Sequence, residues 1–191
     1  MSNNNGTTQD SALSADGRHP ADLDVMTFVT LDTLRTLIHD AGFRAETVVD
    51  GSVTLLRSAS NGLGFDIRSG NVFSEKPDHL ADVAFVAVFA VQGGFPLDLL
   101  NLWNRTHRFG RLFIDRTVPE REFLVLSLDV SVLGGVTAAY LRHKLLIWDS
   151  LVQQLVPWLR EQLGKIASTV DTKETTPSTD WSRSVEPAKA D

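Results

Sequence analysis

Five arginines form the densest cluster of side chains with binding chemistry in this sequence. They occur within one stretch of the chain, at Arg105, Arg108, Arg111, Arg116 and Arg121. Because a guanidinium group offers a planar fork of hydrogen-bond donors, such a cluster can bind phosphates or an acidic partner. Acidic residues are interleaved with it, at Asp98, Asp115, Glu120 and Glu122. A salt-bridged polar surface is therefore the alternative, and it is the interpretation that we favour.

Large apolar side chains in and near the same stretch are candidates for contact with a protein partner. They alternate with basic residues between Trp103 and Asp115, where a helix is expected to give way to a strand. The candidate partner-binding residues are Trp103, Arg108, Phe109, Arg111, Phe113, Leu145 and Trp148. Each apolar member could instead belong to the core, because large aromatic side chains are mostly buried.

Patterns typical of catalytic, cofactor or metal sites are absent from the sequence. The histidines occur in separate segments, and there is no His-Glu-x-x-His pattern and no Gly-x-Ser-x-Gly elbow. Gly62 and Gly64 begin like a dinucleotide loop, but Ile67 replaces the third glycine and the segment leads into a strand. We therefore assign no catalytic, cofactor-binding or metal-binding residue, and we expect no cofactor and no enzymatic activity.

One pair of carboxylates could in principle carry out acid–base chemistry. Asp115 and Asp129 could approach each other on a hairpin, and burial can separate the pKa values of such a pair. Arg111, Arg116 and Arg121 lie close by in the sequence. Ion pairs on a solvated strand face are therefore the preferred interpretation.

Composition limits the class of protein. The chain has 191 residues, of which 42% are hydrophobic, a net charge of −6 and no cysteine. The negative charge disfavours nucleic-acid binding, and the lack of cysteine excludes disulfides and thiolate metal sites. The longest apolar run, residues 83–91, is shorter than the ~20 residues of a membrane helix, and the N-terminal residues lack a signal-peptide pattern. We expect a cytoplasmic protein with no membrane contact.

The distribution of apolar residues predicts one domain between two tails. Residues 1–24 and 165–191 are rich in Ser, Thr, Asp, Pro or Gly and poor in apolar side chains. Such segments cannot bury enough surface to offset the entropy lost on ordering, so both are predicted to be disordered. The domain is predicted to span residues 25–164.

Periodicity predicts the elements of this domain. The segment 30–42 is expected to form a helix, which Thr30 caps at its start and Gly42 follows at its end. Short antiparallel strands follow over 44–49, 52–58 and 63–68, and residues 83–91 form a strand buried on both faces. A second helix begins at Pro96. A hairpin over 111–116 and 122–130 comes next, and a long helix starts at Thr137.

The last helix carries an apolar seam with a period of 3.5 residues. Its members are Leu141, Leu145, Trp148, Val152, Leu155 and Leu159. This spacing is typical of packing against another helix. A second apolar face, at Leu146, Ile147, Leu151 and Val156, leaves two alternatives: burial between the sheet and a helix, or contact with a second subunit. Pro157 is expected to kink or restart the helix.

The order of these motifs resembles the YbjN family of bacterial proteins. The motifs are Leu37 to Gly42 with the Asp50-Gly51 turn, Trp103-Asn104, Arg108-Phe109-Gly110-Arg111, Leu128-Asp129-Val130, and Gly134-Gly135-Val136 before the helix that carries Trp148. The resemblance implies an α+β fold with helices packed on an antiparallel sheet, in the order α-β-β-β-β-α-β-β-α, similar to class I type III secretion chaperones. It also implies a regulator of sensory transduction and transfers no catalytic residue.

The sequence thus predicts a non-enzymatic module, with a regulatory or chaperone-like role, that forms a homodimer and binds an unidentified protein partner. The alternative is a sensor of a small ligand or nucleotide that uses the arginine-rich hairpin around Arg108 and Arg111.

Overall fold

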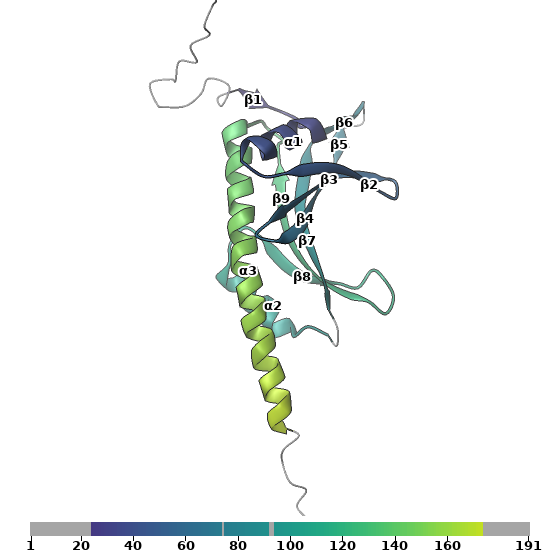
Figure 1. Cartoon of the computed structure of the whole chain (residues 1–191). Helices are drawn as coiled ribbons and strands as arrows, with labels where there is room; N and C mark the ends of the chain where they lie inside the picture. The colour runs from purple at the N-terminus through teal and green to yellow at the C-terminus, as the bar shows by residue number, and fades with distance from the viewer. Residues whose placement is uncertain (1–23, 74, 92–93, 174–191) are drawn as a thin grey trace, which may run out of the picture. The chain divides into compact units, whose positions relative to one another are not determined.

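The computed structural model describes residues 24–73, 75–91 and 94–173. The chain divides into two compact units, residues 1–155 and 156–191. Every strand and the first two helices belong to the first unit, and the third helix continues from the first unit into the second. Figure 1 shows the order of the elements along the chain.

A six-stranded antiparallel sheet is the framework of the first unit. Its strands follow the order β2-β3-β4-β7-β9-β8. Their bounds are β2 Ala45–Asp50, β3 Val53–Ser60, β4 Leu63–Ser69, β7 Asp82–Val91, β8 Arg111–Asp115 and β9 Glu122–Ser131. The α+β fold with a largely antiparallel sheet is therefore confirmed, whereas the likeness to secretion chaperones stays a prediction.

Two small strand pairs were not expected from the sequence. β1 (Val25–Met26) pairs with β10 (Val136–Thr137), and β5 (Val72–Phe73) pairs with β6 (Lys76–Leu80). β1 and β10 are two residues long and β6 contains Pro77, so none shows the extended alternation that identifies a strand.

Local signals place the first two helices. α1 spans Leu31–Asp40, and the Thr30 hydroxyl accepts a hydrogen bond from the Thr33 amide at 3.1 Å, which caps the helix as expected. α2 spans Leu97–Thr106 and begins directly after Pro96. Gly42, after α1, has a φ of +86°, the left-handed conformation that glycine adopts without strain.

α3 spans Ala138–Lys173 and starts where Thr137 was expected to cap it. The Thr137 hydroxyl accepts a hydrogen bond from the Tyr140 amide at 3.2 Å. All six seam residues are buried. In the first unit, Trp148 packs on the rings of Phe65 and Phe85, with centroid separations of 5.4 and 5.7 Å. These contacts fix the face of the sheet that the first part of α3 covers.

The covered face carries the core of the first unit. Strand register places Ile67 beside Phe85 and Phe85 beside Leu128, so neighbouring strands present large apolar side chains to the same side. These three side chains are at most 4% exposed. α1 reaches this face too, because Leu34 and Ile38 line the same small cavity as Phe85 and Leu145.

One expectation about β7 is wrong. The near-continuous apolar run predicted a strand buried on both faces, but among the side chains described from Asp82 to Ala90 only Val83, Phe85 and Ala87 are buried. On the other side, Val88 is 45% exposed and Val86 is half-buried. No helix of the described chain packs on this open face, which is why an all-apolar strand remains partly exposed.

The end of α3 also differs from the expectation. The helix includes Pro157 and continues to Lys173, so residues 165–173 are helical and not part of a disordered tail. Gln162, Lys165 and Ala167, which favour helix, surround the single Gly164. The rest of both predicted tails, 1–23 and 174–191, lies outside the described residues.

Candidate partner-binding surface

The structure places the seven candidate residues in three separate locations. Trp103, Leu145 and Trp148 belong to the core, with exposures of 0, 3 and 0%. Trp103 stacks on His107 with ring centroids 3.5 Å apart. No partner can reach these three side chains without opening the fold. They are core residues, which was the alternative given for each apolar candidate.

Phe109 is the candidate that the fold holds outward. Its side chain is 57% exposed, and its φ of +74° lies in the left-handed region that bulky residues rarely adopt. The Gly110 amide donates a hydrogen bond to the Arg108 carbonyl at 3.0 Å. A bond across one residue at this φ defines a γ-turn of the strained kind, centred on Phe109.

Gly110, the residue directly after Phe109, packs closely against α3. A Cβ atom on Gly110 would lie 2.8 Å from Leu151 Cδ1, closer than any real contact of this kind. Gly110 therefore fits closely against α3 because it has no side chain. The γ-turn at Phe109 lies directly before this close approach, in the join between α2 and β8.

Two cations lie over the exposed ring of Phe109. The Arg108 guanidinium carbon is 5.1 Å from the ring centroid, and Lys144 Nζ of α3 is 5.6 Å from it. Lys144 Nζ also lies 5.1 Å from the centroid of Tyr140, one helical turn earlier. We call these four residues, Arg108, Phe109, Tyr140 and Lys144, the join surface.

A cavity of about 250 Å³ adjoins the join surface. His107 and Phe109 line one part of it, and Ile147 and Gln154 of α3 line another. Within the described residues, neither Arg108 nor Lys144 forms a salt bridge with a carboxylate. The join surface therefore combines exposed aromatic rings with two cations that are unpaired among the described residues, and it lies beside the cavity.

Tyr140 and Lys144 were not among the residues predicted from the sequence. Their spacing of four positions on a helix brings the two side chains together, and this spacing was a usable signal. Their nearness to Phe109 could not be read from the sequence, because it depends on how α3 packs against the α2–β8 join.

Arg111 and Phe113 lie elsewhere, on the open face of the sheet. Arg111 forms an ion pair with Asp129 of β9. Phe113 is 40% exposed and lines a groove of about 550 Å³. The first part of α3 covers the opposite face, so the structure does not unite these two residues with Phe109.

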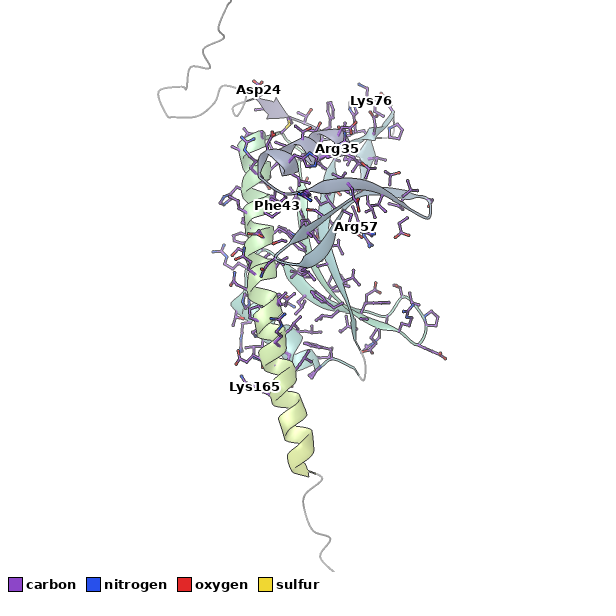
Figure 2. All side chains as sticks on the ribbon, viewed as in Figure 1. Asp24, Arg35, Phe43, Arg57, Lys76 and Lys165 are labelled. Carbon is purple, nitrogen blue, oxygen red and sulfur yellow. The ribbon has the colours of Figure 1, made fainter. Side chains whose placement is uncertain are left out.

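Charged pairs surround the apolar part of the open face. Arg57, which extends from β3 in Figure 2, donates hydrogen bonds to both oxygens of Asp66 at 2.8 and 3.2 Å, and Arg68 donates one at 3.3 Å. Partial burial by itself raises the pKa of Asp66, but the hydrogen bonds and charges of these arginines outweigh it and hold that pKa below its ordinary value.

Asp115 and Asp129 do not form a pair of coupled carboxylates. Asp129 is bound to Arg111, whereas Asp115 accepts the Thr117 amide at 2.8 Å. That backbone hydrogen bond is the main cause that lowers the pKa of Asp115. The preferred interpretation, ion pairs on a solvated strand face, applies to Asp129, whereas Asp115 contacts the backbone of its own turn and forms no ion pair among the described residues.

Asn104 has a structural role that the sequence motif did not reveal. Its side-chain amide donates to the Leu112 carbonyl and accepts from the Leu112 amide, both at 2.9 Å. The side chain of α2 thus occupies the outer hydrogen-bonding edge of β8 at that residue. In the Trp103-Asn104 pair, the first residue is therefore buried in the core and the second hydrogen-bonds the edge strand β8.

The described residues carry neither of two further kinds of functional feature. No group of three or more His, Cys, Asp or Glu side chains there could hold a metal ion. Likewise, none of the described helices combines the length and the apolar character needed to cross a bilayer.

Comparison with known proteins identifies the family. A solved structure of YbjN, "a putative transcription regulator from E. coli", shares 19% sequence identity with this chain. The match covers 69% of this chain and 93% of that one, with a TM-score of 0.49. No curated protein gives a match. The family model of YbjN, described as "Putative bacterial sensory transduction regulator", matches residues 30–161, and the chain therefore belongs to the YbjN family.

Proposed function

We propose that this protein is a non-enzymatic regulatory module that binds an acidic segment of a protein partner at the join surface. The observation that carries the proposal is Phe109, a large aromatic residue that is exposed and held in a strained γ-turn. The family description, which is that of a regulator, supports the regulatory part.

The backbone conformation of Phe109 is the first argument. A bulky residue in the left-handed region costs about 1–3 kcal/mol, and glycine or asparagine would occupy the position with less strain. An exposed ring regains little of that energy through packing. A binding role explains why phenylalanine stands there, because aromatic rings are the side chains that most often anchor interfaces.

The charges around the ring select the partner. Arg108 and Lys144 flank it at 5.1 and 5.6 Å, and Arg105 is exposed in the last turn of α2. Aspartate or glutamate next to an apolar side chain would pair with these cations while the apolar group entered the adjoining cavity. A second copy would bring the same positive surface against itself, which disfavours self-association there.

The test is a selection of binding peptides with paired variants. A phage-displayed library of random peptides is selected on the full-length protein. We expect acidic peptides with an apolar residue that lose binding to Phe109→Asn and to Lys144→Glu. The matched control is Phe113→Ser, a phenylalanine of comparable exposure on the other face of the sheet, which should retain them. Acidic peptides that bind all variants equally, or no enrichment of acidic peptides, would contradict the proposal.

Stability gives a second readout for the same residue. Phe109→Asn should leave the free energy of unfolding unchanged or raise it by up to about 1 kcal/mol, because asparagine tolerates a positive φ. Loss of peptide binding without loss of stability indicates a residue retained for binding. A decrease of more than about 2 kcal/mol would show that Phe109 mainly supports the core.

The other predicted properties keep their own tests. Homodimerisation stays a prediction, and light scattering at high micromolar concentration would measure the mass. Location in the cytoplasm also stays a prediction.

The alternative function, a sensor of a small ligand or nucleotide, would need the arginines to act together. They have separate partners instead: Arg111 binds Asp129, Arg116 binds Glu122, and Arg108 lies over Phe109. No observation favours that alternative over partner binding.

A further inference from the structure

The open face of the sheet carries an apolar stripe where a solvated face is ordinarily polar. Strand alternation places Ala84, Val86, Val88 and Ala90 of β7 on this side, opposite the buried Phe85. β7 pairs with both β4 and β9, so the stripe runs through the interior of the sheet and not along an edge. An interior strand with an uncovered apolar side is a recognisable binding feature.

Neighbouring strands widen the stripe into the floor of a groove. Val125 and Phe123 of β9 and Phe113 of β8 line it beside Val86 and Val88. Phe113 is 40% exposed and Val88 45% exposed, whereas Val125 below them is 5% exposed. The floor therefore offers both a fixed apolar base and accessible rings and methyl groups.

Two turns form the walls of this groove. Asp50, at the β2–β3 turn, and Val118, in the β8–β9 turn, both line it. In Figure 1 these two turns project to the same side of the sheet, away from the first part of α3. The resulting volume of about 550 Å³ lies in the range of known binding pockets.

Two carboxylates without a salt bridge to a described residue lie at the groove. Asp50 and Asp115 line it, and no salt bridge to either occurs among the described residues. Arg68 lines the groove with its guanidinium group bound to Asp66, and the Arg121 guanidinium carbon lies 5.4 Å from the ring centroid of Phe123. The Thr117 amide stabilises the ionised form of Asp115. Asp50 and Asp115 are therefore the groups that a basic ligand would pair with at this site.

We propose that the groove between Asp50 and Val118 binds an extended peptide segment in which lysine or arginine flanks apolar side chains. The apolar side chains pack on Val88, Phe113 and Phe123, and the flanking cations pair with Asp50 and Asp115. A second copy of this chain is the alternative occupant, and the titration distinguishes it from a peptide. This site is independent of the join surface.

The test uses two capped peptides that differ only in charge. Lys-Ser-Val-Ser-Phe-Ser-Lys places its lysines and apolar residues on one side when extended, and Glu-Ser-Val-Ser-Phe-Ser-Glu is the counterpart. Each is titrated into the full-length protein while backbone amide resonances are followed by NMR. We expect the lysine peptide to shift the resonances of Val88, Phe113 and Val125 and the glutamate peptide to leave them unchanged.

Substitutions in the groove show which side chains contribute to binding of the lysine peptide. Phe113→Ser should abolish the shifts, and the double variant Asp50→Asn with Asp115→Asn should weaken binding by about tenfold, since each exposed ion pair contributes modestly. Asparagine keeps an acceptor for the Thr117 amide and suits the turn at position 50, so the fold is retained. The control, Phe109→Asn, should leave the dissociation constant unchanged.

Three outcomes would overturn the proposal. They are equal binding of both peptides, no binding of the lysine peptide at millimolar concentration, and resonance shifts that depend on protein concentration alone. The last outcome would indicate a second copy in the groove. Because Phe109→Asn and Phe113→Ser report on different surfaces, failure here is distinguishable from failure of the function proposed for the join surface.

Discussion

The two faces of the six-stranded sheet carry similar apolar side chains but differ in what covers them. On the covered face, Trp148 is fully buried against Phe65 and Phe85. On the open face, Val88 and Phe113 remain 45 and 40% exposed. The same strand, β7, contributes to both. Apolar character therefore indicates where a protein can make contacts, whereas the packing of helices decides which of those contacts are made within the chain.

The covered face should dominate stability. Trp148→Ala removes a fully buried side chain and leaves a cavity, so the free energy of unfolding should fall by about 3–5 kcal/mol. Denaturant unfolding followed by circular dichroism measures the change. A loss below about 1 kcal/mol would indicate that the covered face is not the main source of stability.

The sheet edge should have an intermediate effect. Asn104→Ala removes both hydrogen bonds to the Leu112 backbone and should lower the free energy of unfolding by about 1–3 kcal/mol. Asn101→Ala, at an exposed position of the same helix, is the matched control and should be neutral or slightly stabilising. Faster hydrogen exchange of the Leu112 amide in Asn104→Ala would locate the loss, and unchanged exchange would contradict it.

The charged network of the open face should contribute less, and in a pH-dependent way. The folded pKa of Asp66 lies below its unfolded value of about 3.9, so its stabilisation is complete above that pH and is lost as the pH falls through the folded pKa. Asp66→Asn should cost about 1 kcal/mol at neutral pH. The difference between the two proteins should shrink below about pH 4; a constant difference would exclude this linkage.

The apolar stripe should have the smallest effect on folding. Val88→Ser changes a partly exposed side chain on the open face and should alter the free energy of unfolding by less than about 0.5 kcal/mol. The same substitution should weaken binding of the lysine peptide. A large loss of stability would mean that the open face belongs to the core, and the contrast between the faces would disappear.

Local features of the sequence predicted much of this fold. Thr30 and Gly42 delimit α1, and the Asp50-Gly51 turn joins β2 to β3, because caps and tight turns depend on a few adjacent residues. The exposure of Val88 could not be predicted. It depends on which face the helices cover, and nothing within β7 distinguishes its two sides by hydrophobicity.

The candidate surface was predicted only in part. Arg108 and Phe109 were identified by their types, and the structure places them together with Tyr140 and Lys144. The backbone conformation of Phe109 was beyond prediction, because phenylalanine rarely adopts a positive φ and nothing in the neighbouring sequence signals one. Trp103 and Trp148 were selected for the same reason as Phe109, their aromatic side chains, but both are buried whereas Phe109 is exposed.

The hydrogen bonds of Asn104 have a consequence for the protein in a crowded solution. β8 is the last strand of the sheet, and an uncovered last strand is a template on which other chains can add. The amide of Asn104 blocks that template at Leu112 only while α2 is folded. Fraying of this ten-residue helix would therefore expose an apolar strand to its neighbours, and we expect conditions that loosen α2 to promote aggregation before the sheet itself unfolds.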